Sequence, residues 1–350
     1  MTRVAINGFG RIGRLVARGL LSGDHGAARA ADLDLVMIND PHCPAATAAH
    51  LLEFDSVHGR MRADISAAAT SMTVNGSRIA VTEAATPDAC DWAAAGIDLV
   101  IEASGRFKDR ASLDGHITAG ARAVLVAAPV KAGALNLVVG VNDHLLGDWM
   151  GQEPTPVVTA ASCTTNCLAP VVKVLHEAIG IRHGSITTVH DVTNTQTLID
   201  APHKDLRRAR SALTSLIPTS TGSATAIGLI FPDLQGRLDG IAVRVPLLNA
   251  SLTDAVFEMA RETSVTEVND LFAAAASRSL AGILGFEMRP LVSVDYRGDT
   301  RSAIVDGLST RVIAGTQVKI YAWYDNEMGY ATRMIDLAAR MAGHMQVSAT

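Results

Sequence analysis

One cysteine in the sequence stands where a thiol could act as a nucleophile. Cys163 lies in the run Ala161–Cys167 (Ala-Ser-Cys-Thr-Thr-Asn-Cys), directly before a segment with apolar residues at helical spacing. The positive end of a helix macrodipole favours the thiolate, which is the nucleophilic form of cysteine. Most single cysteines are small buried hydrophobic residues, and Cys43, Cys90 and Cys167 fit that description. We therefore predict that Cys163 is the catalytic thiol.

A nucleophilic thiol needs a base, and His190 is the best candidate among the eleven histidines. It ends a strand-like run that begins at Ser185. An isolated histidine is more often a surface or core residue than a catalyst, so this position alone does not decide its role. The polar segment that follows His190 favours the catalytic interpretation.

Polar and basic residues in this region indicate two sites for oxyanions. Guanidinium groups and the amides at a helix start both bind phosphate. Alternatively, the arginines lie on a solvated loop and Arg244 forms a salt bridge in its strand. The residues concerned are Ser162 and Thr164 beside the thiol, then Thr193, Thr195, Lys204, Arg207, Arg208, Arg210, Thr221, Gly222 and Arg244.

The N-terminal segment carries a pattern typical of dinucleotide binding. The run Gly-Phe-Gly-Arg-Ile-Gly follows the strand-like residues Arg3–Asn7 and opens a helical stretch. There the first glycine makes a tight turn, the second admits a pyrophosphate and the third lets the helix pack on the sheet. A plain strand-turn-helix is the alternative, which the context disfavours. The predicted cofactor residues of this turn are Gly8, Phe9, Gly10, Arg11, Ile12 and Gly13.

An acidic residue after the next strand-like run, Leu33–Ile38, indicates which cofactor binds. Asp40 would accept hydrogen bonds from an adenosine ribose and repel a 2′-phosphate, which favours NAD over NADP. It lies beyond the usual ~20-residue interval because we expect an extended loop at residues 23–32. A turn acid before Pro41 is the alternative, but the position at a strand end favours cofactor binding.

Composition and charge exclude other classes of protein. The 350 residues fit two domains of ~100 to 200 residues each. A formal net charge of −5 offers no long-range attraction, so we expect no nucleic-acid or membrane partner. We find no secretory signal and no ~20-residue apolar run. The four cysteines form no disulfide framework and no zinc pattern, so we expect no metal and a cytoplasmic location.

The order of the expected elements predicts an α/β protein of two domains. The first third alternates strands and helices, which is typical of a Rossmann doubly wound parallel sheet. Its strands are expected at 3–7, 33–38, 97–102, 123–127 and 137–141, and its helices at 11–21 and 45–53.

From about Val157 longer β segments alternate with helices, which predicts an α+β catalytic domain with a mixed or antiparallel sheet. We expect strands at 185–190, 240–246, 252–259, 291–295 and 318–324, and helices at 163–179, 222–231, 266–279 and 329–343. The domains are predicted at 1–161 for NAD binding and 162–325 for catalysis, with the helix in 326–350 packing back on the NAD-binding domain.

Together these motifs resemble the phosphorylating glyceraldehyde-3-phosphate dehydrogenase family. The resemblance covers nearly the whole chain and is most specific around the cysteine. It implies that Cys163 is the acylated thiol and His190 its base. The matching segments are Ile6–Arg14, Asp55–Gly59, Ser162–Pro170, His203–Arg210, Arg244–Pro246 and Trp323–Glu327.

The resemblance also implies roles for other residues. The substrate's C3-phosphate site is matched by Thr193, Thr195 and Arg244. The inorganic-phosphate site is matched by Ser162, Thr164, Arg208, Thr221 and Gly222. Asn326 matches the residue that holds the nicotinamide carboxamide, and Ser104 joins the expected cofactor residues. The family further implies a homotetramer, in which residues 192–213 reach a neighbouring subunit's cofactor pocket.

Three positions depart from the commonest family pattern. Met328 stands where tryptophan is usual, Asp191 follows His190 where a small residue is common, and Ala201 leaves the selectivity for NAD open. The runs 247–254 and 321–331 look like a branch found beside arsenical-efflux genes. In that branch arsenate replaces phosphate as the acyl acceptor.

We therefore expect NAD-dependent oxidation of D-glyceraldehyde 3-phosphate through a cysteine thioester, giving 1,3-bisphosphoglycerate or 1-arseno-3-phosphoglycerate. Erythrose-4-phosphate dehydrogenase, which hydrolyses the thioester, is the alternative enzyme, and the helix start at Thr221 and Gly222 argues against it. A non-catalytic NAD- or RNA-binding regulator is the alternative of another class. The net charge and the presence of both Cys163 and His190 argue against that alternative.

Overall fold

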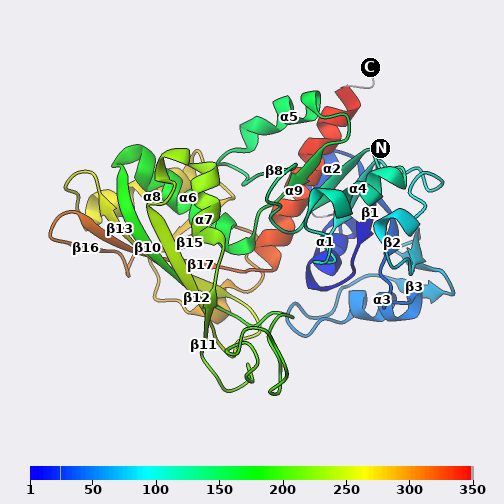
Figure 1. Cartoon of the computed structure of the whole chain (residues 1–350), viewed down its shortest axis with the longest axis horizontal. Coiled ribbons are helices and arrows are strands. Elements are labelled where there is room, and N and C mark those ends of the chain that lie inside the picture. The colour runs from blue at the N-terminus through cyan, green and yellow to red at the C-terminus, as the bar shows by residue number, and fades with distance from the viewer. Residues whose placement is uncertain (24, 348–350) are drawn as a thin grey trace. The chain divides into compact units, whose positions relative to one another are not determined.

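Residues 1–23 and 25–347 are described by the computed structural model shown in Figure 1. Their contacts divide the chain into two units, one formed by Met1–Ser162 with Tyr330–Thr350 and the other by Cys163–Gly329. Residue 24 of the expected loop and residues 348–350 of the expected C-terminal region lie outside the described residues.

The first unit is built on a sheet whose described strands follow the order β3-β4-β5-β2-β1-β6-β7-β9-β8. All neighbours from β5 to β8 are parallel, whereas β3 and β4 form antiparallel pairs at one edge. The order β5-β2-β1-β6-β7-β9 is the 3-2-1-4-5-6 order of dinucleotide-binding sheets. The expected Rossmann fold is confirmed. The bounds are β1 (Thr2–Asn7), β2 (Leu33–Asn39), β3 (Ile65–Ala68), β4 (Ser71–Val74), β5 (Ser77–Thr82), β6 (Leu99–Glu102), β7 (Ala123–Val126), β8 (Leu135–Asn136) and β9 (Val157–Thr159).

The strand predicted at 137–141 is wrong. The strand is the short β8, and the chain turns directly after it. Leu137, Val138 and Val139 are apolar because they are buried. The amide of Val138 donates to the side chain of Asn142 at 2.8 Å, so a local side chain takes the place of a strand partner.

The helices predicted at 11–21 and 45–53 are confirmed as α1 and α3, and the one predicted at 329–343 begins one residue earlier, whereas α2, α4 and α5 were not predicted. The C-terminal helix packs against α1, because a methyl group on Gly19 would collide with Ile335, and Gln346 donates to Thr2 at 3.3 Å (Figure 1). The bounds are α1 (Arg11–Leu21), α2 (Gly26–Ala30), α3 (Ala45–Glu53), α4 (Arg110–Thr118), α5 (Leu146–Gln152) and α9 (Met328–Val347).

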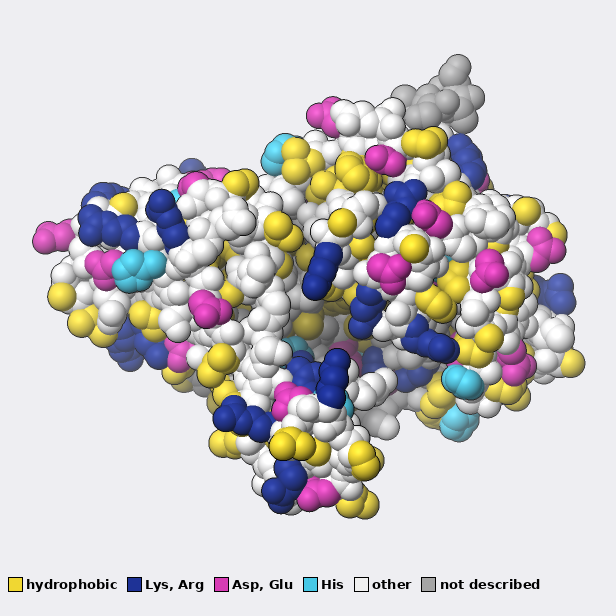
Figure 2. Space-filling view, in the orientation of Figure 1, with side chains coloured by type: hydrophobic (Ala, Val, Ile, Leu, Met, Phe, Trp, Pro, Cys, Tyr) yellow, Lys and Arg dark blue, Asp and Glu magenta, His cyan; other side chains and the backbone are white. Residues whose placement is uncertain are grey.

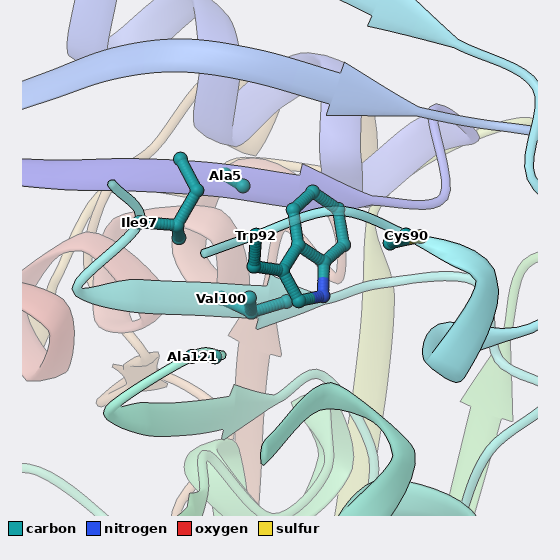
Figure 3. Packing of buried hydrophobic residues seen from close by; sticks show 6 residues of the cluster. All are labelled: Ala5, Cys90, Trp92, Ile97, Val100 and Ala121. Carbon is teal, nitrogen blue, oxygen red and sulfur yellow. The ribbon is translucent and has the colours of Figure 1, made fainter. Parts of the chain in front are cut away.

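A tryptophan fills the core beside β1 and β6, as Figure 3 shows. Trp92 is fully buried with Ala5, Ile97 and Val100, and its indole Nε1 donates to Nδ1 of His116 at 3.1 Å. Because an indole can only donate, Nδ1 of His116 accepts and its Nε2 carries the proton. That proton is donated to a buried carboxylate at the end of β6, Glu102, at 3.0 Å.

The second unit is built on a mixed sheet, as the sequence predicts. Its described strands follow the order β11-β12-β10-β13-β17-β15-β14, with β16 beside β17. Only β10 with β12 and β14 with β15 pair in parallel. The strand bounds are β10 (Ile181–His190), β11 (Ile217–Ser220), β12 (Leu238–Arg244), β13 (Ser251–Met259), β14 (Leu284–Glu287), β15 (Ala303–Asp306), β16 (Arg311–Ile313) and β17 (Gln317–Tyr324).

Three helices accompany this sheet, and α6 contacts β10, β13, β15 and β17 as well as the other two helices (Figure 1). Their bounds are α6 (Cys163–Ala178), α7 (Ser223–Ile230) and α8 (Val265–Ser277). The strand predicted at 291–295 is wrong, since Ser293–Tyr296 is a 3₁₀ turn. The side chains of Val292 and Val294 are exposed, so this apolar pattern does not mark a buried face.

The buried chain of hydrogen bonds from Trp92 generates a stability prediction. Trp92→Phe removes the indole N–H and leaves Nδ1 of His116 unpaired, which we expect to lower the free energy of unfolding by about 1–3 kcal/mol beyond the lost packing. Urea denaturation measures the change. Trp149→Phe is the matched control, because that indole donates to Val157 at 3.2 Å from a half-buried position that water can reach. Equal losses in both variants would contradict the role given to His116.

Candidate active site

Cys163 is the first residue of α6 and the one half-buried cysteine among the four, all of which are free. Cys43, Cys90 and Cys167 are buried, as the sequence predicts. Burial raises the pKa of Cys90 and of Cys167 to about 12, so both stay protonated thiols at neutral pH. Among the four cysteines, only Cys163 is both accessible to solvent and located at the positive end of a helix.

His190 ends β10 and faces that thiol. Its Nε2 lies 3.6 Å from Sγ of Cys163. The edge of its ring meets the buried Tyr324 ring at a centroid distance of 5.9 Å, which fixes the plane of the imidazole. The predicted thiol and base are therefore within hydrogen-bonding distance of each other.

The opposite side of the imidazole carries two charged groups. Oδ1 of Asp191 and Nη1 of Arg244 each lie 2.7 Å from Nδ1 of His190. Burial by itself would lower the pKa of His190, but the hydrogen bonds from Asp191 and Cys163 outweigh it and raise that pKa to about 9. The carboxylate and the thiol thus favour the imidazolium form of His190.

Strand register brings these groups together. Arg244 is the partner of His190 in the parallel pair of β10 with β12, and Ser251 is the partner of Tyr324 in the antiparallel pair of β13 with β17. The hydroxyl of Ser251 donates to Oδ1 of Asp191 at 2.9 Å. Asn326 donates from Nδ2 to Oδ2 of Asp191, also at 2.9 Å.

Four of the predicted anion-binding residues lie in three small groups. The hydroxyls of Thr193 and Thr195 are 3.0 Å apart. Nε of Arg208 donates to Thr219 at 2.7 Å, and Thr221 lies at the start of α7, where its hydroxyl contacts Ser223 at 3.1 Å.

The solvated-loop interpretation fits part of the arginine cluster. Arg210 is exposed and pairs with Asp200 at 2.8 Å, whereas Arg208 is half-buried.

Thr164 is buried, and its hydroxyl lies 2.9 Å from that of Tyr324.

The glycine turn of the first unit has the geometry that a dinucleotide requires. Gly8 has a φ of +95°, and a methyl group there would collide with the backbone of Ser104. A methyl group on Gly13 would collide with the carbonyl of Gly8, so α1 packs tightly on the turn. Gly10, the N-cap residue of α1, has no neighbouring atom within 4 Å of the position that a Cβ would occupy, which leaves room for a ligand at the helix start.

Parallel strands carry the remaining cofactor residues to the same edge. The carboxylate of Asp40, after β2, accepts from the amides of Phe9 at 2.8 Å and His42 at 3.0 Å. Ser104, after β6, donates its hydroxyl to Glu102 at 2.5 Å. Because the carboxyl ends of β1, β2 and β6 meet here, the predicted residues surround one helix start and fit NAD.

Arg11 and Ile12 occupy the first turn of α1. Arg11 forms an ion pair with Asp55. Burial would raise the pKa of Asp55, but Arg11 and the amides of Val57 and His58 hold it well below its usual range. Arg11 is thereby oriented by a carboxylate that the glycine pattern does not reveal.

Two residues that contact His190 or its neighbour were not predicted as site residues from the sequence. Asp191 stands out only as a departure from the family pattern, and Ser251 carries no local signal. Both become neighbours of His190 or its partners through the sheet. Within the described residues, no group of three or more His, Cys, Asp and Glu could hold a metal ion, and no helix is long and apolar enough to cross a bilayer.

A 3-2-1-4-5-6 sheet with a glycine turn, joined to a second unit with a mixed sheet and a thiol, defines a dinucleotide-dependent dehydrogenase. Residues 2–110 match the NAD-binding domain of glyceraldehyde 3-phosphate dehydrogenase, and residues 162–326 match the C-terminal domain of the same family. The chain belongs to the glyceraldehyde-3-phosphate dehydrogenase family, as the resemblance indicates, and its cofactor is NAD.

Similar proteins cover almost the full length of the chain. Glyceraldehyde-3-phosphate dehydrogenase 3 of Nostoc sp. is 57% identical over 97% of this chain and 98% of its own. The glyceraldehyde-3-phosphate dehydrogenase of Geobacillus stearothermophilus is 48% identical, with the same coverage of both chains. That of Pseudomonas aeruginosa is 47% identical, again over 97% and 98%.

Two glycines of the turn should separate folding from cofactor binding. Gly8→Ala is strained by its φ and by the collision with Ser104, so we expect it to destabilise the protein by about 1–3 kcal/mol. Gly10→Ala meets no neighbour, so it should leave stability unchanged and weaken NAD binding at least about tenfold. Thermal denaturation and calorimetric titration with NAD measure the two effects. Unchanged NAD affinity in Gly10→Ala would contradict the assignment of the pyrophosphate to this turn.

Proposed function

We propose that this protein oxidises D-glyceraldehyde 3-phosphate with NAD and transfers the resulting acyl group from a cysteine to an inorganic oxyanion. The similar proteins carry the name of that dehydrogenase. The observation that carries the proposal is the 3.6 Å distance from Sγ of Cys163 to Nε2 of His190 at the start of a helix.

Cys163 begins the reaction by adding its thiolate to the aldehyde carbon. One S–C bond forms, and the carbonyl electrons move to the oxygen. The Nε2–H of the protonated His190 stabilises this oxyanion and donates a proton to it, which gives a hemithioacetal. His190 takes the proton back as the carbon is oxidised to a thioester, so its role alternates between acid and base.

The first unit holds the cofactor for this oxidation. NAD, when bound, supplies the acceptor for the hydride. The amides at the start of α1 and the open face of Gly10 bind the pyrophosphate, and Asp40 accepts from the adenosine ribose. Ser104 belongs to the same edge of the sheet. The family resemblance assigns the nicotinamide carboxamide to Asn326.

Two anion sites complete the chemistry. Thr193, Thr195 and Arg244 hold the C3-phosphate of the substrate. The acceptor anion is held by Ser162, Thr164, Arg208, Thr221 and Gly222. An oxygen of the acceptor anion attacks the thioester carbon and forms a C–O bond. The S–C bond breaks, and Cys163 leaves as a thiolate paired with the protonated His190.

The acceptor is phosphate or arsenate, and the product is 1,3-bisphosphoglycerate or 1-arseno-3-phosphoglycerate. Both anions are tetrahedral and use the same donors. The runs 247–254 and 321–331 support membership of the arsenate branch. The ratio of kcat/KM for arsenate to that for phosphate tests this branch.

We also propose a cytoplasmic homotetramer. The segment 192–213 carries apolar side chains that are 60% to 81% exposed, namely Leu198, Ile199, Leu206 and Leu213. Figure 2 shows hydrophobic and basic side chains gathered on the lobe that lies below β11 in Figure 1. A neighbouring subunit would cover such a surface.

The thiol is tested by substitution. Cys163→Ser should lower NADH formation by at least about 10³-fold, because a hydroxyl is a far weaker nucleophile at neutral pH. NAD binding, measured by calorimetric titration, should persist. Cys167→Ser is the control, since that cysteine is buried four residues farther along α6 and should leave turnover intact. Full turnover in Cys163→Ser would refute the mechanism.

The two anion sites are tested by a pair of variants with near-isosteric side chains. Thr221→Val removes one hydroxyl from the acceptor site, and Thr195→Val removes one from the substrate site. Loss of a hydrogen bond to a charged group should raise the affected KM about tenfold or more. We expect the KM of phosphate or arsenate to rise in the first variant and the KM of the aldehyde in the second. The reverse pattern would show that the assignments of the substrate site and the acceptor site must be exchanged.

A further inference from the structure

A buried carboxylate adjoins the proposed base on the side away from the thiol. Asp191 is 1% exposed, and its Oδ1 lies 2.7 Å from Nδ1 of His190. Sγ of Cys163 lies 3.6 Å from the other ring nitrogen. Thiol, imidazole and carboxylate therefore form a continuous series across one ring.

Both carboxylate oxygens have further partners. Ser251 donates to Oδ1 and Asn326 donates to Oδ2, each at 2.9 Å, and the amide of Asp191 donates to Ser251 at 3.2 Å. Asp191 is thus held from β13 and from the residue after β17. A buried carboxylate with several donors keeps its position without adjustment during a reaction.

The charged and titratable groups around His190 come from four elements. They are Cys163 on α6, Asp191 after β10, Arg244 on β12 and Tyr324 on β17. Arg244 lowers the pKa of His190, whereas Asp191 raises it. The Arg244 guanidinium can donate to Nδ1 only when that nitrogen is unprotonated. Its Nη1 also donates to the carbonyl of Asp191 at 2.9 Å, so it keeps a partner when Nδ1 carries a proton.

We propose that Asp191 is a positioning residue that keeps a proton on Nδ1 of His190, so that Nε2 alone exchanges protons at the reacting centre, and that the same carboxylate orients Asn326. This inference rests on the proposed roles of Cys163 and His190. It makes the arrangement Cys163–His190–Asp191 a triad, in which the acid fixes the tautomer of the base. It also couples the base to the proposed nicotinamide anchor through one side chain.

The carboxylate has a defined effect on protonation. With Asp191 present, the pKa of His190 is about 9, and the imidazolium persists until the pH rises through that value. Without the carboxylate, burial and Arg244 still lower the pKa of His190 and only Cys163 remains to raise it, so the imidazolium is lost at a lower pH. Removal of the Asp191 carboxylate is therefore expected to lower the pKa of His190.

Asp191→Asn tests the inference with a side chain of the same size. NMR titration of labelled histidines, with the His190 resonance assigned by its loss in His190→Gln, measures the pKa without substrate. We expect a fall of about one pH unit or more in Asp191→Asn. Asp233→Asn is the matched control, because it removes a carboxylate 2.6 Å from the imidazole of His176 and should leave His190 unchanged.

The orienting role has a separate readout. Asp191→Ser, which cannot reach Asn326 as a carboxylate does, should raise the KM of NAD more than Asp191→Asn, whose amide oxygen can still accept from Asn326. A His190 pKa that changes by less than ~0.3 units in Asp191→Asn would overturn the inference. If that variant does not fold, a pKa of 7 or below for His190 in the unaltered protein overturns it, and a value above ~8 supports it.

These outcomes are distinguishable from failure of the proposed function. The titration needs neither aldehyde nor turnover, so it reports on Asp191 even if the protein does not oxidise glyceraldehyde 3-phosphate. Full turnover by Cys163→Ser would contradict the proposed mechanism. The titration result for Asp191 and His190 would remain valid.

Discussion

The contact between Sγ of Cys163 and Nε2 of His190 is the interaction on which the proposed chemistry of the second unit depends. A thiolate and an imidazolium stabilise each other, and neither group is useful if the other is displaced by an ångström or two. The helix start of α6 supplies the first group and the end of β10 supplies the second. The packing of α6 against β10, β13, β15 and β17 holds the two ends at this distance.

Sheet register extends this pair into a larger site. Arg244 lies beside His190 because β12 pairs in parallel with β10, and Ser251 lies opposite Tyr324 because β13 pairs with β17. A slip of one residue in either pair would turn these side chains to the other face of the sheet. The apolar side chains that alternate along β13 and β17 oppose such a slip, since it would expose them to water. Core packing and the geometry of the candidate site thus depend on the same register.

In the first unit the start of α1 follows a glycine turn, and its N-cap residue, Gly10, faces open space. Steric closeness at Gly8 and Gly13 sets the turn, and Gly10 leaves the face of the helix open. Beneath the turn, Glu102 accepts from Asn7 at 2.5 Å, from Ser104 and from His116, so the carboxyl ends of β1 and β6 are tied together by one buried acid. Buried carboxylates need such donors, and here the donors come from the end of β1, from the loop after β6 and from α4.

The sequence alone determined the features that are local. The glycine turn after β1, the cysteine at the start of α6 and the doubly wound order of the first domain follow from spacing, turn chemistry and hydrophobic period, which act over a few residues. It misjudged 137–141 and 291–295, where apolar residues reflect burial or an exposed turn and not an extended strand, and it missed the hairpin of β4 and β5 at Asn75 and Gly76. Only the tertiary structure decided that Arg244 lies beside His190 and that Ser251 lies beside Asp191, because both contacts depend on strand pairing between segments 50 or more residues apart. Long-range register is an outcome of the whole core, and no short window of sequence contains it.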